Sequence, residues 1–126
     1  MNVKIDTKEK FTVIMPEEAE LSANMTEEIK NLLLSYQQKD IPHVILKMND
    51  VQGINEGVAE LLAEIQQEFY EKNMSFVICG LQQAVEDLLD EKELLEIMNI
   101  TPTESEAWDI VQMEEIEREL LADGDE

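Results

Sequence analysis

Residues 49–57 form a short polar turn whose side chains are better suited than any others in this chain to recognise another molecule. The turn follows an apolar run at residues 44–48 and opens an amphipathic segment, which predicts a helix over residues 55–71. The first turn of a helix has backbone N–H groups without partners and the positive end of the helix dipole, so polar contacts form readily there. We predict a recognition surface at this helix start and at the nearby loop 22–24, made of Ser22, Asn24, Asn49, Asp50, Asn55, Glu56, Gly57 and Glu60.

The same turn also has a purely structural interpretation. Asn55 is a good N-cap residue and Gly53 suits a tight turn, so the segment could be an ordinary connection between a strand and a helix. No serine or threonine occurs between Tyr36 and Met74. Nothing near the turn can therefore be phosphorylated on a Ser or Thr hydroxyl.

Residues typical of catalytic sites are scarce. His43 is the single histidine and precedes a predicted strand, so we expect an exposed or structural residue at a strand edge rather than a catalytic base. Cys79 lies inside an apolar run, where a thiol usually acts as a small hydrophobic group. The many glutamates have the spacing of solvated helix faces, and the glycines do not form a phosphate-binding loop. We predict that the chain is not an enzyme and holds no cofactor or metal.

Composition restricts both the class of protein and the class of partner. The chain has 126 residues, 44% of them hydrophobic and 31% charged, as expected for one globular domain. It has neither an apolar run long enough to span a membrane nor an export signal, and its single cysteine cannot form an internal disulfide, so we expect a cytoplasmic protein. The formal net charge of -21 disfavours nucleic acid and anionic membranes. It favours a basic protein partner, although it also serves solubility.

The rest of the sequence predicts the elements that position the turn. Apolar runs indicate strands near residues 3–5, 11–15, 44–48 and 76–81, with a short edge strand at 97–101. Apolar positions three and four apart indicate helices near residues 26–36, 55–71 and 85–95, the last as one or two pieces. The capping box Thr103-Glu-Ser-Glu106 starts a final helix over about residues 103–122, followed by an acidic tail at 123–126. No linker divides the chain, which predicts one domain over residues 1–122.

This order of elements indicates an α/β fold with a mixed sheet. A strand–helix–strand unit at its centre requires a right-handed crossover and hence parallel strands, whereas the first two strands are expected to pair antiparallel. Trp108 is expected to be a half-buried packing residue of the last helix. The apolar positions 113, 116 and 120 continue this helix beyond what a small domain easily covers, which favours an extra contact.

Several segments resemble the STAS domain family, which includes the anti-sigma factor antagonists. The similarity covers about residues 3–112 and depends on the order and spacing of its motifs rather than on any one of them. These motifs are Ala19-Glu-Leu-Ser-Ala-Asn24, Val44-Ile-Leu-Lys-Met48, Ile54-Asn-Glu-Gly-Val58, Phe76-Val-Ile-Cys-Gly-Leu81 and Pro102-Thr-Glu-Ser-Glu-Ala107. The resemblance implies a mixed β-sheet of four to five strands with about four helices, mainly on one face. It also implies a non-enzymatic regulatory module whose partner is an anti-sigma factor or a related serine kinase.

The chain departs from the family pattern at the phosphorylation switch. In typical members a partner kinase phosphorylates a serine at the start of the second main helix. Here that position holds Gly57 or Glu56, because two alignments differ by one residue, and Asn55 replaces the usual aspartate. A glycine leaves a bare helix start, whereas a glutamate places a fixed negative charge at the positive end of the helix dipole. Either residue removes the phosphoacceptor.

Two functions follow as expectations from this resemblance. The first is an anti-sigma factor antagonist-like binding module that regulates transcription without the usual phosphorylation switch. The second is a structural or scaffold STAS domain inside a larger regulatory or transporter-associated complex. The sequence leaves the formation of a homodimer open.

Overall fold

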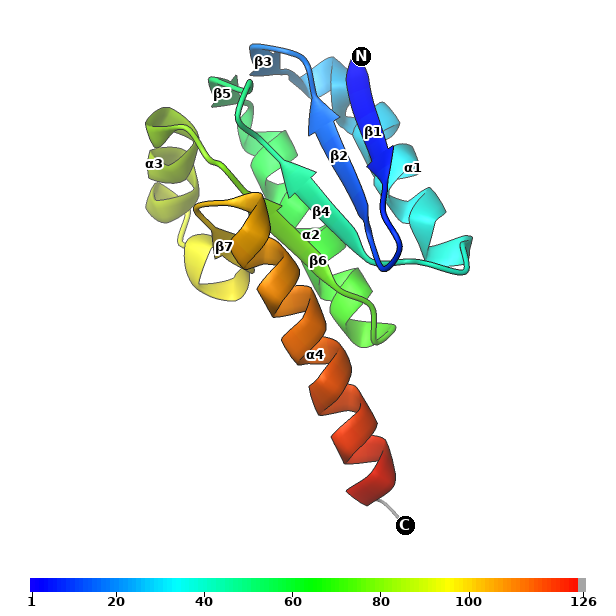
Figure 1. Ribbon diagram of the computed structural model, residues 1–126. Helices are drawn as coiled ribbons and strands as arrows, with labels where there is room; N and C mark the ends of the chain where they lie inside the picture. The colour runs from blue at the N-terminus through cyan, green and yellow to red at the C-terminus, as the bar shows by residue number, and fades with distance from the viewer. Residues whose placement is uncertain (125–126) are drawn as a thin grey trace.

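A five-stranded mixed sheet forms the centre of the fold (Figure 1). The computed structural model describes residues 1–124, with side chains described for residues 1–122. β1 is antiparallel to β2 and β4 is parallel to β6, as the sequence predicted, and the β2–β4 and β6–β7 pairs are also parallel. The strands lie side by side in the order β1 (Val3–Thr7), β2 (Thr12–Pro16), β4 (Val44–Lys47), β6 (Phe76–Cys79) and β7 (Ile100–Thr101).

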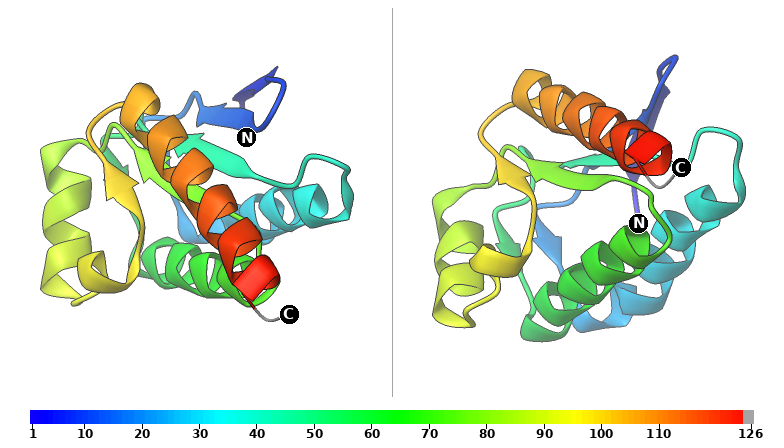
Figure 2. Two further views of the ribbon diagram at one scale, coloured as in Figure 1. Left: turned by 60° about the horizontal axis from the view of Figure 1, so that its bottom comes forward. Right: turned by 90° about the horizontal axis from the view of Figure 1, so that it is seen from below.

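The helices are divided unequally between the two faces of the sheet. α1 (Thr26–Ser35), α2 (Glu56–Glu71) and α3 (Gln83–Glu91) contribute to one hydrophobic core, and α4 (Glu104–Gly124) alone covers the opposite face (Figure 2). The prediction of about four helices mainly on one face is therefore confirmed, with α4 as the exception. Short 3-10 turns at Ala23–Met25, Tyr36–Gln38 and Leu95–Ile97 flank α1 and follow α3.

The central strands are apolar on both faces because both faces are covered. In β4, Val44 and Leu46 belong to the larger core with α1 and α2, whereas Ile45 belongs to the smaller core under α4. β6 alternates in the same way, with Phe76 and Ile78 on the first face and Val77 and Cys79 on the second. This arrangement explains the nearly continuous apolar runs of the sequence.

The last helix is fixed to the sheet near its start. Thr103 Oγ1 accepts a hydrogen bond from the backbone N–H of Glu106 at 3.2 Å, which confirms the predicted cap. Trp108 is half-buried, as predicted, and its ring stacks on Phe11 with centroids 4.6 Å apart. α4 continues to Gly124, beyond the predicted end at 122, and the rest of the predicted acidic tail lies outside the described residues.

A second, two-stranded sheet was not predicted. β3 (Glu20–Leu21) runs parallel to β5 (Gly53–Ile54), although the sequence indicated no strand in the first segment and a tight turn in the second. Gly53 is therefore a strand residue, and the tight-turn interpretation is wrong. Strands of two residues have no hydrophobic period to detect, so only contacts between distant segments reveal them. The edge strand expected at 97–101 is limited to β7, because a 3-10 turn at Leu95–Ile97 precedes it.

Candidate functional site at the start of helix α2

The β3–β5 pair holds the 22–24 loop beside the start of α2. The backbone N–H of Asn55 donates to the carbonyl oxygen of Leu21 at 2.9 Å, and the N–H of Gln52 donates to that of Ala19 at 2.7 Å. The side chain of Leu21 is buried in the larger core, which fixes the two-stranded sheet to the rest of the domain. These contacts bring together two segments about 30 residues apart in the chain, at the edge of the main sheet where the parallel strands end (Figure 1).

Asn55 caps the helix, as one of the two interpretations of the turn required. Its side-chain Oδ1 accepts a hydrogen bond from the backbone N–H of Gly57 at 2.7 Å, which satisfies one of the free N–H groups of the first turn. Glu56, Gly57 and Glu60 are exposed on the first two turns of α2. The capping role does not conflict with recognition, because these neighbouring groups still face solvent.

One lysine partly neutralises this helix start. Lys92, at the end of α3, places its Nζ 3.1 Å from a carboxylate oxygen of Glu60 and 3.8 Å from one of Glu56. The hydrogen bond to Glu60 raises the pKa of Lys92, and the nearby negative charges of Glu56, Glu60 and Glu91 raise it further. Two carboxylates share one ammonium group, so the surface stays negative and suits a partner with positive charge.

The loop residues are ordered by their own contacts. Ser22 Oγ donates a short hydrogen bond to Asn24 Oδ1, and the backbone N–H of Met25 donates to the carbonyl oxygen of Ser22 at 3.0 Å. Ser22 is half-buried and Asn24 is exposed. The loop therefore presents the amide of Asn24 next to the start of α2.

Asn49 and Asp50 lie at the end of β4, on the side of the site that faces α3. The carbonyl oxygen of Asn49 accepts a hydrogen bond from the side chain of Gln82 at 2.7 Å, and the Asn49 side chain lies against the backbone of Gly80. Asp50 is exposed and follows directly. The structure thus places these two residues at the same edge of the sheet as the helix start, with Asn49 in contact with the loop that follows β6.

His43 and Cys79 are structural residues. His43 is buried, its Nδ1 accepts a hydrogen bond from the backbone N–H of Ser75 at 3.0 Å, and burial lowers its pKa. Cys79 is completely buried and burial raises the pKa of its thiol to about 11, far from that of a reactive cysteine. His43 is therefore a buried structural residue, not an exposed one.

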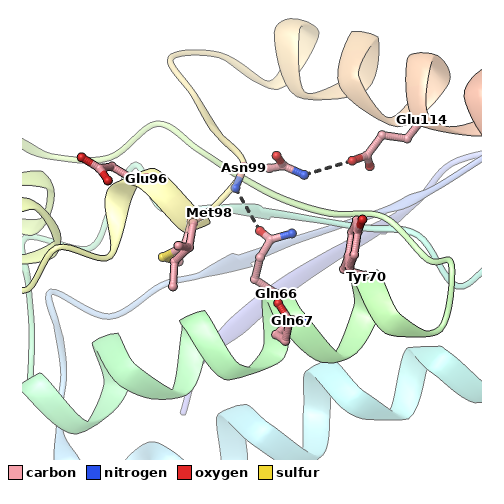
Figure 3. A pocket seen from close by; sticks show the side chains of 8 residues that line it. Gln66, Gln67, Tyr70, Glu96, Met98, Asn99 and Glu114 are labelled. Atoms are coloured by element: carbon pink, nitrogen blue, oxygen red, sulfur yellow. Dashed lines mark hydrogen bonds between the residues drawn. The ribbon is translucent and has the colours of Figure 1, made fainter.

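A hollow of about 280 Å³ between α2, the segment before β7 and α4 was missed from the sequence (Figure 3). Its polar groups bond to one another: the backbone N–H of Asn99 donates to Gln66 Oε1 at 3.0 Å, and Asn99 Nδ2 donates to Glu114 Oε2 at 3.1 Å. The figure shows Tyr70 at the same wall, one helical turn from Gln66. These bonds join three elements, whereas the second carboxylate oxygen of Glu114 is buried without a hydrogen-bond partner and lies 3.8 Å from Arg118 Nη2. The spacing of Gln66 and Tyr70 on one helix face was the available sequence signal.

Among the residues that the structure describes, no three His, Cys, Asp or Glu side chains gather as a metal site would require. No described helix combines the length and the hydropathy of a membrane span.

Comparisons with known proteins decide the family. The sequence signature of the STAS domain matches residues 2–107. The chain belongs to the STAS domain family. STAS domains are generally regulatory, non-catalytic modules. A search of curated protein sequences found no match.

Solved STAS structures share the fold of this chain. A proposed anti-sigma factor antagonist from Thermotoga maritima has a TM-score of 0.79 and 21% identity, and the match covers 87% of this chain and 94% of that protein. The unphosphorylated anti-sigma factor antagonist SpoIIAA has a TM-score of 0.70 and 17% identity, over 88% and 96% of the two chains. Part of the murine anion transporter Slc26a9 has a TM-score of 0.65 and 14% identity, over 82% of this chain but 18% of the transporter.

Proposed function

We propose that this STAS protein is a non-enzymatic regulatory module that binds a protein partner through the start of α2 and the 22–24 loop. The observation that carries the proposal is the β3–β5 pair, which fixes two exposed polar segments side by side at the capped end of a helix. A rigid arrangement of this kind loses little conformational entropy when a partner binds. The fold shared with anti-sigma factor antagonists supports this role.

The proposed module works without a Ser/Thr phosphorylation switch at the start of α2. Glu56 is the first residue of α2 and its side chain is 75% exposed, so a permanent carboxylate stands at the helix start. The next residue, Gly57, offers only its backbone, and its N–H is already bonded to Asn55. Whichever of the two takes the acceptor position, the binding state cannot be reversed there by a kinase.

The proposed partner is an anti-sigma factor or a related serine kinase-like regulator with a basic contact surface. Glu56, Glu60 and Asp50 supply the negative charge, and the amides of Asn24 and Asn55 supply directional polar groups. The overall charge of -21 would accelerate the encounter. Transcription regulation in the cytoplasm follows from such a partner.

Binding assays with charge variants test the site. The full chain is used to capture partners from native lysate, and the affinity of each captured regulator is measured for Glu56→Lys, Gly57→Asp and Glu71→Lys. Glu71 is exposed at the other end of α2, so Glu71→Lys makes the same charge change away from the site. We expect at least a tenfold loss for the first two variants and little change for the control. Unchanged binding in both site variants would refute the proposed surface.

Mass spectrometry tests the missing switch. The intact protein is incubated with candidate serine kinases and ATP, and its mass and partner affinity are measured. We expect no stoichiometric phosphate that changes partner affinity. Phosphate at another residue that does change affinity would show that a switch exists elsewhere.

A structural role in a larger assembly is the second candidate. It is favoured by the shared fold with one part of an anion transporter, together with the exposed outer side of α4. Light scattering of the full chain over a range of concentrations separates the two roles. A defined large oligomer would favour the scaffold, whereas a monomer that binds one regulator would favour the first function.

A further inference from the structure

Helix α4 has a row of apolar side chains that no part of the described chain covers. Met113, Ile116 and Leu120 are 59%, 55% and 65% exposed, although residues of these types are usually buried. They are three and four residues apart, so they form one stripe along the helix. Ala107 and Val111 are completely buried against the sheet. With 3.6 residues per turn, the stripe lies on the side of α4 directed away from the domain, the side open to solvent in Figure 2.

The stripe is not needed to attach α4 to the sheet. The stacking of Trp108 on Phe11 fixes the first half of the helix. In the second half, Arg118 Nη2 donates to Ser75 Oγ at 3.0 Å. These contacts use the inner side of the helix, so the outer apolar side chains add nothing to docking within the chain. A contiguous exposed apolar surface of this kind typically marks an interaction site.

Acidic residues border the stripe on both sides. Glu117 is exposed along one side and Glu119 along the other, with Glu106 and Asp109 exposed toward the start of the helix. Arg118 is the single basic residue of α4, and it points inward to Ser75. The stripe therefore has the arrangement of a coiled-coil seam, with apolar positions at the centre and the carboxylates of Glu117 and Glu119, together with the uncharged Gln112, at the flanking positions.

We propose that Met113, Ile116 and Leu120 form a docking surface for a basic amphipathic helix of a partner protein. Leucine-like side chains of that helix would pack on the stripe, while its lysines or arginines would pair with Glu117 and Glu119. A second copy of this chain is a poor occupant, because it would place the same carboxylates opposite one another and bring together two molecules of charge -21. The surface lies beyond residues 2–107, which match the STAS signature, and is separate from the start of α2.

A synthetic helical peptide tests the surface directly. The probe carries leucine at its seam and lysine at its flanking positions, and its binding to the full chain is followed by fluorescence anisotropy. A peptide of the same seam with glutamate flanks is the charge control. We expect saturable binding of the lysine peptide that weakens as NaCl is raised, and no detectable binding of the glutamate peptide.

Variants of exposed residues locate the binding. The triple variant Met113→Gln/Ile116→Gln/Leu120→Gln should bind at least tenfold more weakly. Tyr70→Gln/Ile97→Gln, at exposed apolar positions outside α4, should bind as the unmodified chain does. The fluorescence of Trp108, the single tryptophan, checks that α4 stays docked in each variant. Glu117→Lys/Glu119→Lys should reverse the preference toward the glutamate peptide.

Several results would overturn the inference. If the triple variant bound the lysine peptide as tightly as the unmodified chain does, the assay would be measuring only general charge attraction. If only Glu56→Lys lost affinity for the lysine peptide, the peptide would bind at the start of α2. Dimerisation that disappears in the triple variant would identify a second copy as the occupant. Binding of the stripe to anionic vesicles rather than to the peptide would identify a membrane instead. A result for this surface leaves the proposed function of the α2 site unaffected.

Discussion

Asn55 and Glu56 are adjacent residues at the start of α2 that have different roles. Asn55 Oδ1 accepts a hydrogen bond from the backbone N–H of Gly57 at 2.7 Å, whereas the Glu56 side chain makes no capping bond and is 75% exposed. The first residue stabilises the helix and the second is available to a partner. A binding site can therefore be built on the same few residues that fix the end of the helix.

Replacing the cap tests this division. Asn55→Ala removes the acceptor for the N–H of Gly57, so we expect a loss of about 1 kcal/mol in the free energy of unfolding. Asn55→Asp keeps an acceptor oxygen at the same place and is the matched control. Urea unfolding followed by circular dichroism measures both variants. Equal destabilisation by alanine and aspartate would contradict the capping role.

A glycine in the loop after β6 supports the neighbouring turn. Gly80 has a φ of 70°, a left-handed conformation, and a Cβ added there would meet the side chain of Asn49. We expect Gly80→Ala to lower the free energy of unfolding by at least roughly 1–2 kcal/mol, from the backbone conformation alone.

Gly53→Ala is the matched control for Gly80→Ala. The new Cβ at Gly53 would meet only the end of the flexible, exposed Glu20 side chain, which can move away. In urea titrations of both variants, the loss in free energy of unfolding should be clearly smaller for Gly53→Ala than for Gly80→Ala. Adding Asn49→Ala to Gly80→Ala should recover the steric part of the loss, and no recovery would mean that the backbone conformation accounts for all of it.

At the scale of elements, α4 is attached to the sheet through a small polar cluster. Burial lowers the pKa of His43, the nearby Glu115 carboxylate opposes this shift from 3.5 Å, and Arg118 reinforces it. Arg118 also donates to Ser75, whose backbone N–H bonds to His43. The cluster joins the residues that precede β4 and β6 to α4, so the protonation of His43 affects how the last helix is held.

The lowered pKa of His43 predicts a pH dependence of stability. As pH falls, His43 in the unfolded chain takes up a proton near its ordinary pKa of 6.5, before His43 in the folded chain does. The contribution of neutral, buried His43 to the free energy of unfolding is therefore fully present above pH 6.5 and is lost as pH falls through the pKa of the folded state. We expect the difference in free energy of unfolding between the unmodified chain and His43→Asn to shrink as pH falls below about 6.5.

His43→Asn isolates this effect because it retains a side-chain acceptor for Ser75 while removing the titrating ring. The many carboxylates titrate in both proteins, so their contribution largely cancels in the difference. An NMR titration of the single histidine measures its pKa in the folded state directly. A pKa above 6.5, with a growing difference at low pH, would show that Glu115 outweighs burial.

The whole molecule carries a formal charge of -21, so its folded state works against self-repulsion. Compact folding brings thirty carboxylates closer together than they are in the unfolded chain, and nine basic residues offset only part of this. The same charge suits rapid association with a basic partner. Solubility and encounter rate are therefore gained at some cost in stability.

Salt should stabilise the fold. Raising NaCl from about 0.01 to 0.15 M shortens the screening length from about 30 to about 8 Å, which weakens the repulsion between exposed carboxylates. We expect the free energy of unfolding to increase over this range in urea titrations. The matched variant Glu17→Gln/Glu27→Gln/Glu64→Gln replaces exposed glutamates and should gain less from salt. A loss of stability with salt would mean that surface ion pairs outweigh the repulsion.

Local patterns in the sequence were sufficient to predict most of the elements. The cap at Asn55, the cap at Thr103 and the apolar faces of β4 and β6 all depend on neighbouring residues and regular spacing. The absence of Ser and Thr from the segment that contains the start of α2 is a property of the sequence alone. These features needed no knowledge of which distant segments meet.

Only the tertiary structure decided where those elements lie relative to one another. The pairing of β3 with β5, the burial of His43 under α4 and the contact between Asn49 and Gly80 each join segments roughly 30 or more residues apart. Such contacts leave no periodic signal in a single sequence, because any polar segment can adopt an irregular conformation until a distant partner fixes it. The sequence thus supplied the candidate residues, and the long-range packing decided that the 22–24 loop lies beside the start of α2.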